Sequence, residues 1–155
     1  MKKLLAITLV LPIAGVLACK KSEPPPPPPP PTLAAPATTL PAPVSVSGVT
    51  LGAAIGADKR VATATDVFAL KDTIYASVET VGTGHAKLRA LWSFVKGGQT
   101  AKVDETTIEF HSTGPAVNEF HISKPSGWPP GDYTLEIFLN DAATPAARKS
   151  LKVAG

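Results

Sequence analysis

Residues 88–95 have the sequence LRALWSFV, and this stretch decides the fold class. Its even-numbered positions hold Leu, Ala, Trp and Phe, whereas its odd-numbered positions hold Arg, Leu, Ser and Val. A period of two residues places alternate side chains on opposite faces of a β-strand. The same period recurs in residues 74–79 (IYASVE) and 133–140 (YTLEIFLN). These stretches predict strands that each turn an apolar face toward a common core.

Shorter runs with the same period extend the pattern along the chain. They occupy residues 44–51, 107–111, 117–122 and 149–153, and glycine or proline lies in the gaps. Residues 52–66 show no pattern that assigns them to an element. No apolar stripe of helical period follows the first nineteen residues. About seven short strands within about 110 residues predict an all-β antiparallel sandwich.

Two aromatic residues narrow the type of sandwich. Trp92 occupies an inward position of a strong strand, and the segment PPGD leads directly to Tyr133 at the start of another. This arrangement resembles the immunoglobulin-like fold, which buries a Trp and carries a tyrosine corner. Leu135 stands where antibody domains carry their second Cys, with Ala76 or Val78 as its counterpart on the facing sheet. The resemblance therefore implies a core without a disulfide.

Three further segments carry a looser resemblance. Residues 127–140 (GWPPGDYTLEIFLN), 72–78 (DTIYASV) and 119–125 (EFHISKP) are similar to small immunoglobulin-like domains of bacterial envelope lipoproteins. The similarity covers about 110 residues, the usual size of such a domain. That group has no common activity, so the resemblance implies a fold and a location only.

The first eighteen residues predict a signal peptide. Lys2 and Lys3 precede an apolar stretch over residues 4–18. As a helix this stretch would extend about 22 Å, less than the roughly 30 Å of a bilayer's hydrocarbon core. A short apolar segment behind a basic start favours a secretory signal over a membrane anchor.

Residues 16–19 (VLAC) resemble the lipobox of bacterial lipoproteins. The resemblance implies cleavage before Cys19 and transfer of diacylglycerol to its thiol, followed by acylation of the new amino group with a chain such as palmitate. Lys20, in place of an Asp after the cysteine, implies export to the outer membrane, where the protein would face the periplasm. An ordinary cleaved signal peptide with an incidental cysteine remains the alternative.

Residues 19–43 predict a spacer. Residues 24–31 are eight consecutive prolines, followed by a stretch rich in Pro, Ala and Thr. Proline favours the polyproline II helix, so the run forms a rod of about 25 Å and the remainder a disordered tether. A PxxP ligand for an SH3-like partner is the alternative interpretation. The chain thus divides into residues 1–18, 19–43 and 44–155.

The charge distribution argues against nucleic acid as a partner. The net charge of +3 comes from 15 basic and 12 acidic residues. Four of the basic residues precede residue 22, and Glu23 is the one acidic residue before residue 44, so the predicted domain holds eleven of each. A neutral domain offers no basic footprint for a polyanion. The single Cys excludes a disulfide framework within the chain.

No constellation of residues predicts catalysis, a metal or a cofactor. His85 is expected in a glycine-rich loop. His111 and His121 are expected on neighbouring strands joined at Gly114, which would place them about 13 Å apart. The carboxylates are spread over strands and turns, with no nucleophile elbow or glycine-rich phosphate loop. We therefore expect no enzyme.

Binding is the remaining class of function. Leu91, Val95 and Phe138 occupy outward positions of neighbouring strands, which predicts a small apolar patch that docks another envelope protein or a second copy. Scattered apolar surface residues are the alternative interpretation. A second class is loop-mediated inhibition, as in chagasin-type protease inhibitors. Its candidate loops are residues 81–85, 97–100 and 126–131, which lack that family's motifs.

Overall fold

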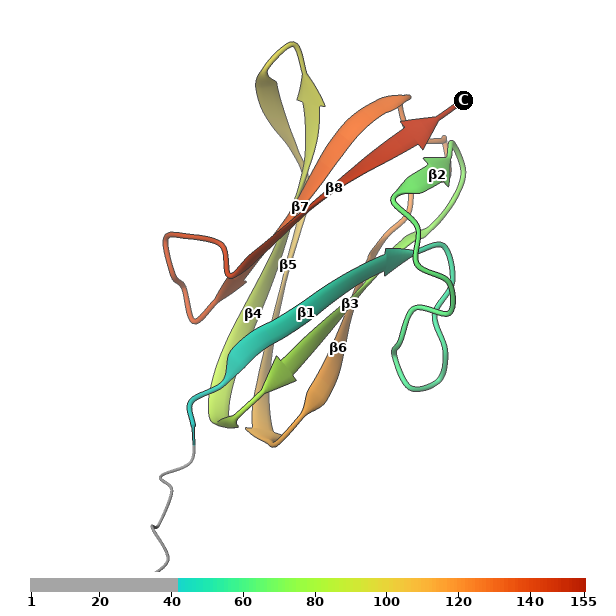
Figure 1. The fold of residues 1–155 in the computed structure, drawn as a ribbon. Coiled ribbons are helices and arrows are strands. Elements are labelled where there is room, and N and C mark those ends of the chain that lie inside the picture. Colours follow the sequence, from blue (N-terminus) through green and yellow to red (C-terminus); the bar gives the residue numbers. More distant parts are fainter. Residues whose placement is uncertain (1–41) are drawn as a thin grey trace, which may run out of the picture. The chain divides into compact units, whose positions relative to one another are not determined.

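The computed structural model describes residues 42–155 (Figure 1). The predicted signal peptide, the lipidation site at Cys19 and the proline run lie outside these residues, so the predictions for them stay predictions. Within the described part, no helix has the length and apolar character needed to cross a membrane.

Eight strands form two sheets, and the domain is an all-β immunoglobulin-like sandwich, as predicted (Figure 1). The three-stranded sheet has the order β1 (Ser45–Gly52), β3 (Ile74–Val81) and β6 (Ala116–Ile122). The five-stranded sheet has the order β2 (Val67–Ala69), β8 (Ala147–Ala154), β7 (Gly131–Leu139), β4 (Thr83–Lys96) and β5 (Gln99–Thr113). Neighbouring strands are antiparallel except β2 and β8, which are parallel.

The β4–β5 hairpin is longer than the sequence pattern predicted. The two strands pair as far as Lys96 and Gln99, and the tip projects at the top of Figure 1. Gly97 and Gly98 both have positive φ, 58° and 79°, which a type I′ turn requires. The turn therefore consists of Gly97 and Gly98 alone, and the other two residues of the predicted loop 97–100 already belong to β5.

The predicted hairpin at Gly114 is wrong. β5 pairs with β4 and β6 pairs with β3, so the turn at Gly114 carries the chain from one sheet to the other. β5 and β6 therefore contribute apolar side chains to the core from opposite sheets, because the core lies between the two layers. His85 also differs from expectation, since it lies within β4 rather than in a loop.

The core confirms the two aromatic positions that defined the fold. Trp92 is 0% exposed and lies among Leu135 of the same sheet and Val78 of the facing sheet, which are equally buried. The hydroxyl of Tyr133 donates a hydrogen bond to the carbonyl oxygen of Pro129 at 2.8 Å. This bond to the backbone a few residues upstream is the defining contact of a tyrosine corner.

The segment between β1 and β2 packs on part of the outer face of the three-stranded sheet. Ser77 points away from the core on β3, yet it is buried. Its hydroxyl accepts a hydrogen bond from the Val61 amide at 2.9 Å and donates one to the carbonyl oxygen of Lys59 at 2.6 Å. Among residues 42–155, no comparable segment packs on the outer face of the five-stranded sheet.

Candidate binding face

Side chains on the outer face of the five-stranded sheet stand in rows that run across the strands. One row combines two valines with an opposite charge pair, in the order Val67, Lys152, Asp132, Val95. In the next row toward the middle of the sheet, β8, β7 and β4 contribute the short polar side chains of Ser150, Thr134 and Ser93. Residues directly opposite on neighbouring strands have their Cβ atoms within about 5.5 Å, so each row is a continuous strip of surface.

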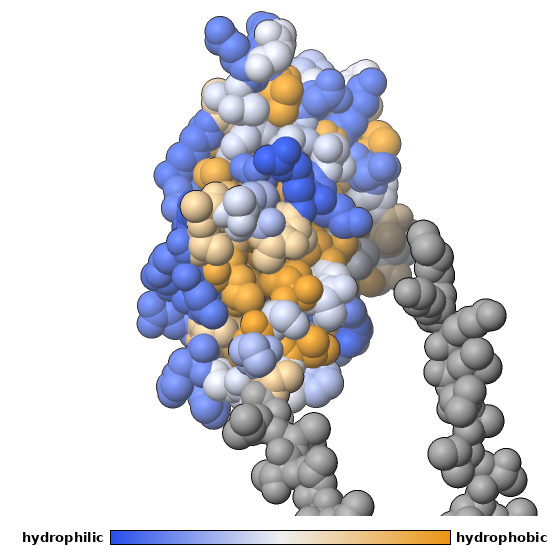
Figure 2. Space-filling model, turned by 60° about the vertical axis from the view of Figure 1, so that its left-hand side comes forward, coloured by the Kyte–Doolittle hydropathy of each residue, from blue (hydrophilic) through white to orange (hydrophobic). Residues whose placement is uncertain are grey.

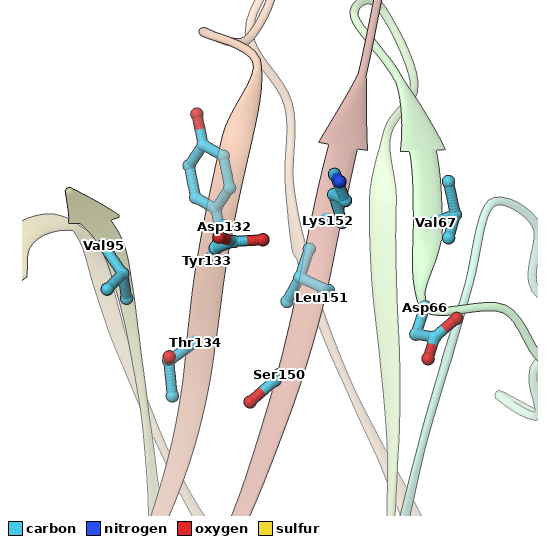
Figure 3. Close-up of a pocket in the computed structure, with 9 residues that line it drawn as sticks. All are labelled: Asp66, Val67, Val95, Asp132, Tyr133, Thr134, Ser150, Leu151 and Lys152. Carbon is cyan, nitrogen blue, oxygen red and sulfur yellow. The ribbon is translucent and has the colours of Figure 1, made fainter. Parts of the chain in front are cut away.

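The short side chains leave a shallow hollow of about 470 Å³ in this face (Figure 3). Val67 and Val95 stand on opposite sides of it, and Val67 is 54% exposed. Asp132 and Lys152 project from the neighbouring strands between them, and Asp66 comes from the residue before β2. The hollow thus has apolar walls, short hydroxyl side chains on its floor and charges of both signs.

A row of ion pairs borders the hollow toward the centre of the sheet. Arg148 donates to a carboxylate oxygen of Glu136 from Nε at 2.9 Å. Glu105 accepts from Lys102 at 2.5 Å and from Arg89 at 3.4 Å. The hydrogen bond and charge of Lys102, together with Arg89, lower the pKa of Glu105 against a smaller opposing effect of desolvation. These pairs form a polar border beside the hollow.

The three residues predicted as an apolar patch all lie on this face but do not form one patch. Leu91 is half-buried between Glu105 and Glu136 on the neighbouring strands. Val95 lies at the hollow. Phe138 differs from the expectation of an exposed side chain, because it is 7% exposed and the Arg89 guanidinium carbon lies 4.0 Å from its ring centroid. This cation–π contact covers the ring.

Val67 is the functional candidate that the sequence pattern missed. It belongs to β2, a strand of only three residues whose single buried side chain is Phe68. Three residues are too few to display a period, and β2 joins the sheet through parallel pairing with the distant β8.

Apolar residues also reach the surface elsewhere. Figure 2 shows a face on which they gather in the middle, with hydrophilic residues around them. Several residues packed against the core are only partly buried, among them Val46, Phe94, Phe110 and Leu139. Such exposure is ordinary for a small domain. The hollow is distinguished by its shape and its mixed lining rather than by apolar character alone.

The structure does not bring all three loops considered for an inhibitory role together at one end. Residues 81–85 and 97–100 lie at opposite ends of β4 (Figure 1). In the loop 126–131, Trp128 is buried, its amide donates to Leu70 at 2.6 Å and its indole donates to Asp72 at 2.9 Å. Its large side chain therefore stabilises the domain and is not presented to a partner.

The histidines are arranged differently from the prediction. His85 and His111 lie directly opposite each other on β4 and β5, whereas His121 is on β6 in the other sheet, 3.0 Å from Glu119. Among residues 42–155, no group of three or more His, Cys, Asp or Glu side chains is placed to hold a metal ion.

Comparisons with known proteins extend to the fold only. No family model matches the chain, and no curated protein matches it. An immunoglobulin-like protein from Pseudomonas aeruginosa is 19% identical, with a TM-score of 0.48, over 73% of this chain and 98% of that one. A β-glucosidase from Erythrobacter marinus is 9% identical, with a TM-score of 0.49, over 72% of this chain. An alkylpurine DNA glycosylase from Pseudomonas fluorescens, bound to DNA with an abasic site analogue, is 13% identical over 74% of this chain, with a TM-score of 0.47.

The chain spans only 15% of the β-glucosidase and 31% of the glycosylase. The activities of these two enzymes therefore indicate nothing about the function of this chain.

Proposed function

We propose that this protein is a lipid-anchored envelope protein whose immunoglobulin-like domain is a non-catalytic binding module. Cys19 would carry the lipid, and the proline-rich spacer would hold the domain away from the outer membrane on its periplasmic side. The partner is another envelope protein or a second copy of the chain. The observation that carries the binding role is the outer face of the five-stranded sheet, which residues 42–155 leave open, with its hollow between Val67 and Val95.

The composition of this face suits a protein partner. Interfaces combine apolar side chains at the centre with a polar border, which excludes water from the contact. Here an apolar side chain of the partner would contact Val67 and Val95 while its polar groups meet Asp132 and Lys152. Short floor residues such as Thr134 leave room for that side chain. The ion pairs around Glu136 and Glu105 would supply the border.

The same residues argue for binding rather than catalysis. Glu105 and Glu136 form ion pairs with lysine and arginine side chains, and His121 lies within hydrogen-bond distance of Glu119. A general acid–base pair needs a titratable group that faces a substrate site with a pKa near neutrality. The hollow holds no histidine, and its carboxylates Asp66 and Asp132 are set in an open surface.

Photo-crosslinking from the hollow tests the binding role. A photoreactive residue replaces the partly buried Val95 in the full-length chain in the bacterial envelope. The control carries it at Val81, which is 40% exposed and belongs to the other sheet. We expect an adduct from position 95 and none from position 81. Adding Val67→Glu should reduce the adduct about tenfold, because the carboxylate replaces the apolar contact and can pair with Lys152 directly opposite, which the partner would otherwise meet.

The mass of the adduct identifies the partner class. An adduct of twice the chain's mass indicates a second copy, and any other mass indicates a different envelope protein. Equal crosslinking from positions 95 and 81, or none from position 95, would contradict the proposed face.

The anchoring role has a separate test. Cys19→Ser removes the thiol that would accept diacylglycerol, so the variant should carry no label when cells are supplied with radioactive palmitate, whereas the parent should be labelled. Two or three acyl chains hold a protein firmly, whereas none remains in this variant. Equal labelling of the variant and the parent would refute lipidation at Cys19 and leave the binding face unaffected.

A further inference from the structure

Two histidines form a cross-strand pair on the outer face of the β4–β5 hairpin. His85 and His111 are opposite each other in the register of the two strands, with ring centroids 4.6 Å apart and ring planes inclined by 57°. Both side chains are exposed, while Ala86, next to His85, is buried on the inner face. The pair is therefore open to solvent on one side and fixed to a sheet on the other.

The separation of the rings matches that of two imidazoles bound to one metal ion. A Zn–N bond of about 2.0–2.1 Å puts the metal about 3.2 Å from each ring centroid. Two such rings then have centroids about 4.5 Å apart at a right-angled geometry and about 5.2 Å apart at a tetrahedral one. The observed 4.6 Å lies within this range, so rotation of the side chains alone would turn the nitrogens toward a shared ion.

The charges around the pair favour a cation. Lys87 and Glu109 form the neighbouring cross-strand pair, and Lys87 makes an ion pair with Asp141 from the β7–β8 connection. These side chains, His85 and Asn140 line a hollow of about 280 Å³. One ammonium faces two carboxylates, so the surroundings carry no excess positive charge that would repel a divalent ion.

We propose that His85 and His111 together bind one divalent transition-metal ion of the class that prefers imidazole, such as Cu²⁺, Ni²⁺ or Zn²⁺. The two rings supply two ligands, and water fills the other positions. Mg²⁺ and Ca²⁺ require oxygen ligands and would not bind. With two protein ligands the ion exchanges with solvent and keeps open positions, unlike the ion of a closed structural site. The site lies apart from the hollow between Val67 and Val95 and does not depend on its role.

Calorimetric titration with ZnCl₂ tests the site. The full-length chain is used without a histidine tag and with Cys19→Ser, so that no thiol or tag binds the metal. One ion should bind per chain, and His85→Asn or His111→Asn should each weaken binding about 10²-fold, since chelation is lost. His121→Asn is the matched control and should leave the affinity unchanged.

Spectroscopy of the parent chain provides a measurement that needs no variant. Electron paramagnetic resonance of bound Cu²⁺ should show coupling to two imidazole nitrogens. Coupling to one nitrogen, unchanged Zn²⁺ affinity in His111→Asn, or an equal loss of affinity in His121→Asn would overturn the proposal. Since both rings are exposed, the Asn variants should melt at the parent temperature, which circular dichroism verifies.

Discussion

Replacing Gly82 by Ala should destabilise the domain far more than replacing Gly84. Gly82 connects β3 of one sheet to β4 of the other, with φ +100°. A Cβ there would lie 2.3 Å from the carbonyl oxygen of Pro43 and 2.8 Å from that of Ala42. Gly84 also has positive φ, +121°, but its Cβ would meet nothing within 4 Å. Both alanine variants therefore carry backbone strain, but only Gly82→Ala also carries a steric conflict.

The structure sets the size of the difference. Both variants carry the strain of a left-handed side chain, about 1–2 kcal/mol, less a few tenths for the stiffer unfolded chain. Gly82→Ala must also displace residues 42–43 by about 1 Å to reach normal contact distances. This movement breaks the 2.9 Å bond from the Thr83 amide to Ala42, about 1 kcal/mol, and loosens the buried Val44. We expect an extra loss of about 2 kcal/mol, or a melting temperature about 8–16 °C lower than that of Gly84→Ala.

Urea and thermal unfolding followed by circular dichroism measure this difference, and hydrogen exchange of the Thr83 amide reports the broken bond. Equal melting temperatures for the two variants, with the Thr83 amide as protected as in the parent, would refute the account of the corner. Faster exchange with equal melting temperatures would show that residues 42–43 detach without weakening the core, which also contradicts the predicted size.

Three further changes follow from the core and the outer face. Trp92→Ala should cost about 3–5 kcal/mol in urea unfolding, because it empties the centre of the sandwich. Tyr133→Phe should cost about 1 kcal/mol at neutral pH, through loss of the bond to the exposed Pro129. Burial raises the pKa of the Tyr133 hydroxyl in the folded state. The stability that the neutral hydroxyl contributes is therefore complete below about pH 10 and is lost as the pH rises through the folded-state pKa. In alkaline solution the difference in unfolding free energy between the parent and Tyr133→Phe should shrink or change sign. Arg89→Ala should uncover Phe138, which a hydrophobic dye would detect, at a cost of about 0.5–1 kcal/mol.

The strands that the sequence predicted are those whose burial alternates over many residues. In β4 the sequence period and the observed burial coincide from Leu88 to Trp92, because one face packs on the core and the other meets solvent. Trp92 and Tyr133 could be placed because their environments are specific to this fold. β2 could not, since its position depends on parallel pairing with the distant β8 rather than on its own three residues.

The position of His85 opposite His111 depends on the register of β4 and β5, which the period of the sequence alone does not determine. A two-residue turn at Gly97–Gly98 would align His85 with Phe110 if the strands paired without interruption. A bulge at Val103 shifts the register by one residue, so that Trp92 lies opposite Asp104 and His85 opposite His111. The shift also returns Phe110 to the inner face, beside Ala86. The sequence around Val103 does not predict the bulge, because the bulge stabilises the domain by allowing apolar residues farther along the strand to be buried.

Three of the four edge strands have features that oppose the addition of another strand. β5 is a long edge strand, but it carries the bulge and places the charged Asp104 on the inner side, opposite Trp92. β1 carries a bulge between Val46 and Gly48, and β2 is only three residues long. Such features prevent another strand from continuing a sheet. These three edges oppose strand addition, and in the proposed binding mode the hollow between Val67 and Val95 would present side chains of four neighbouring strands to the partner.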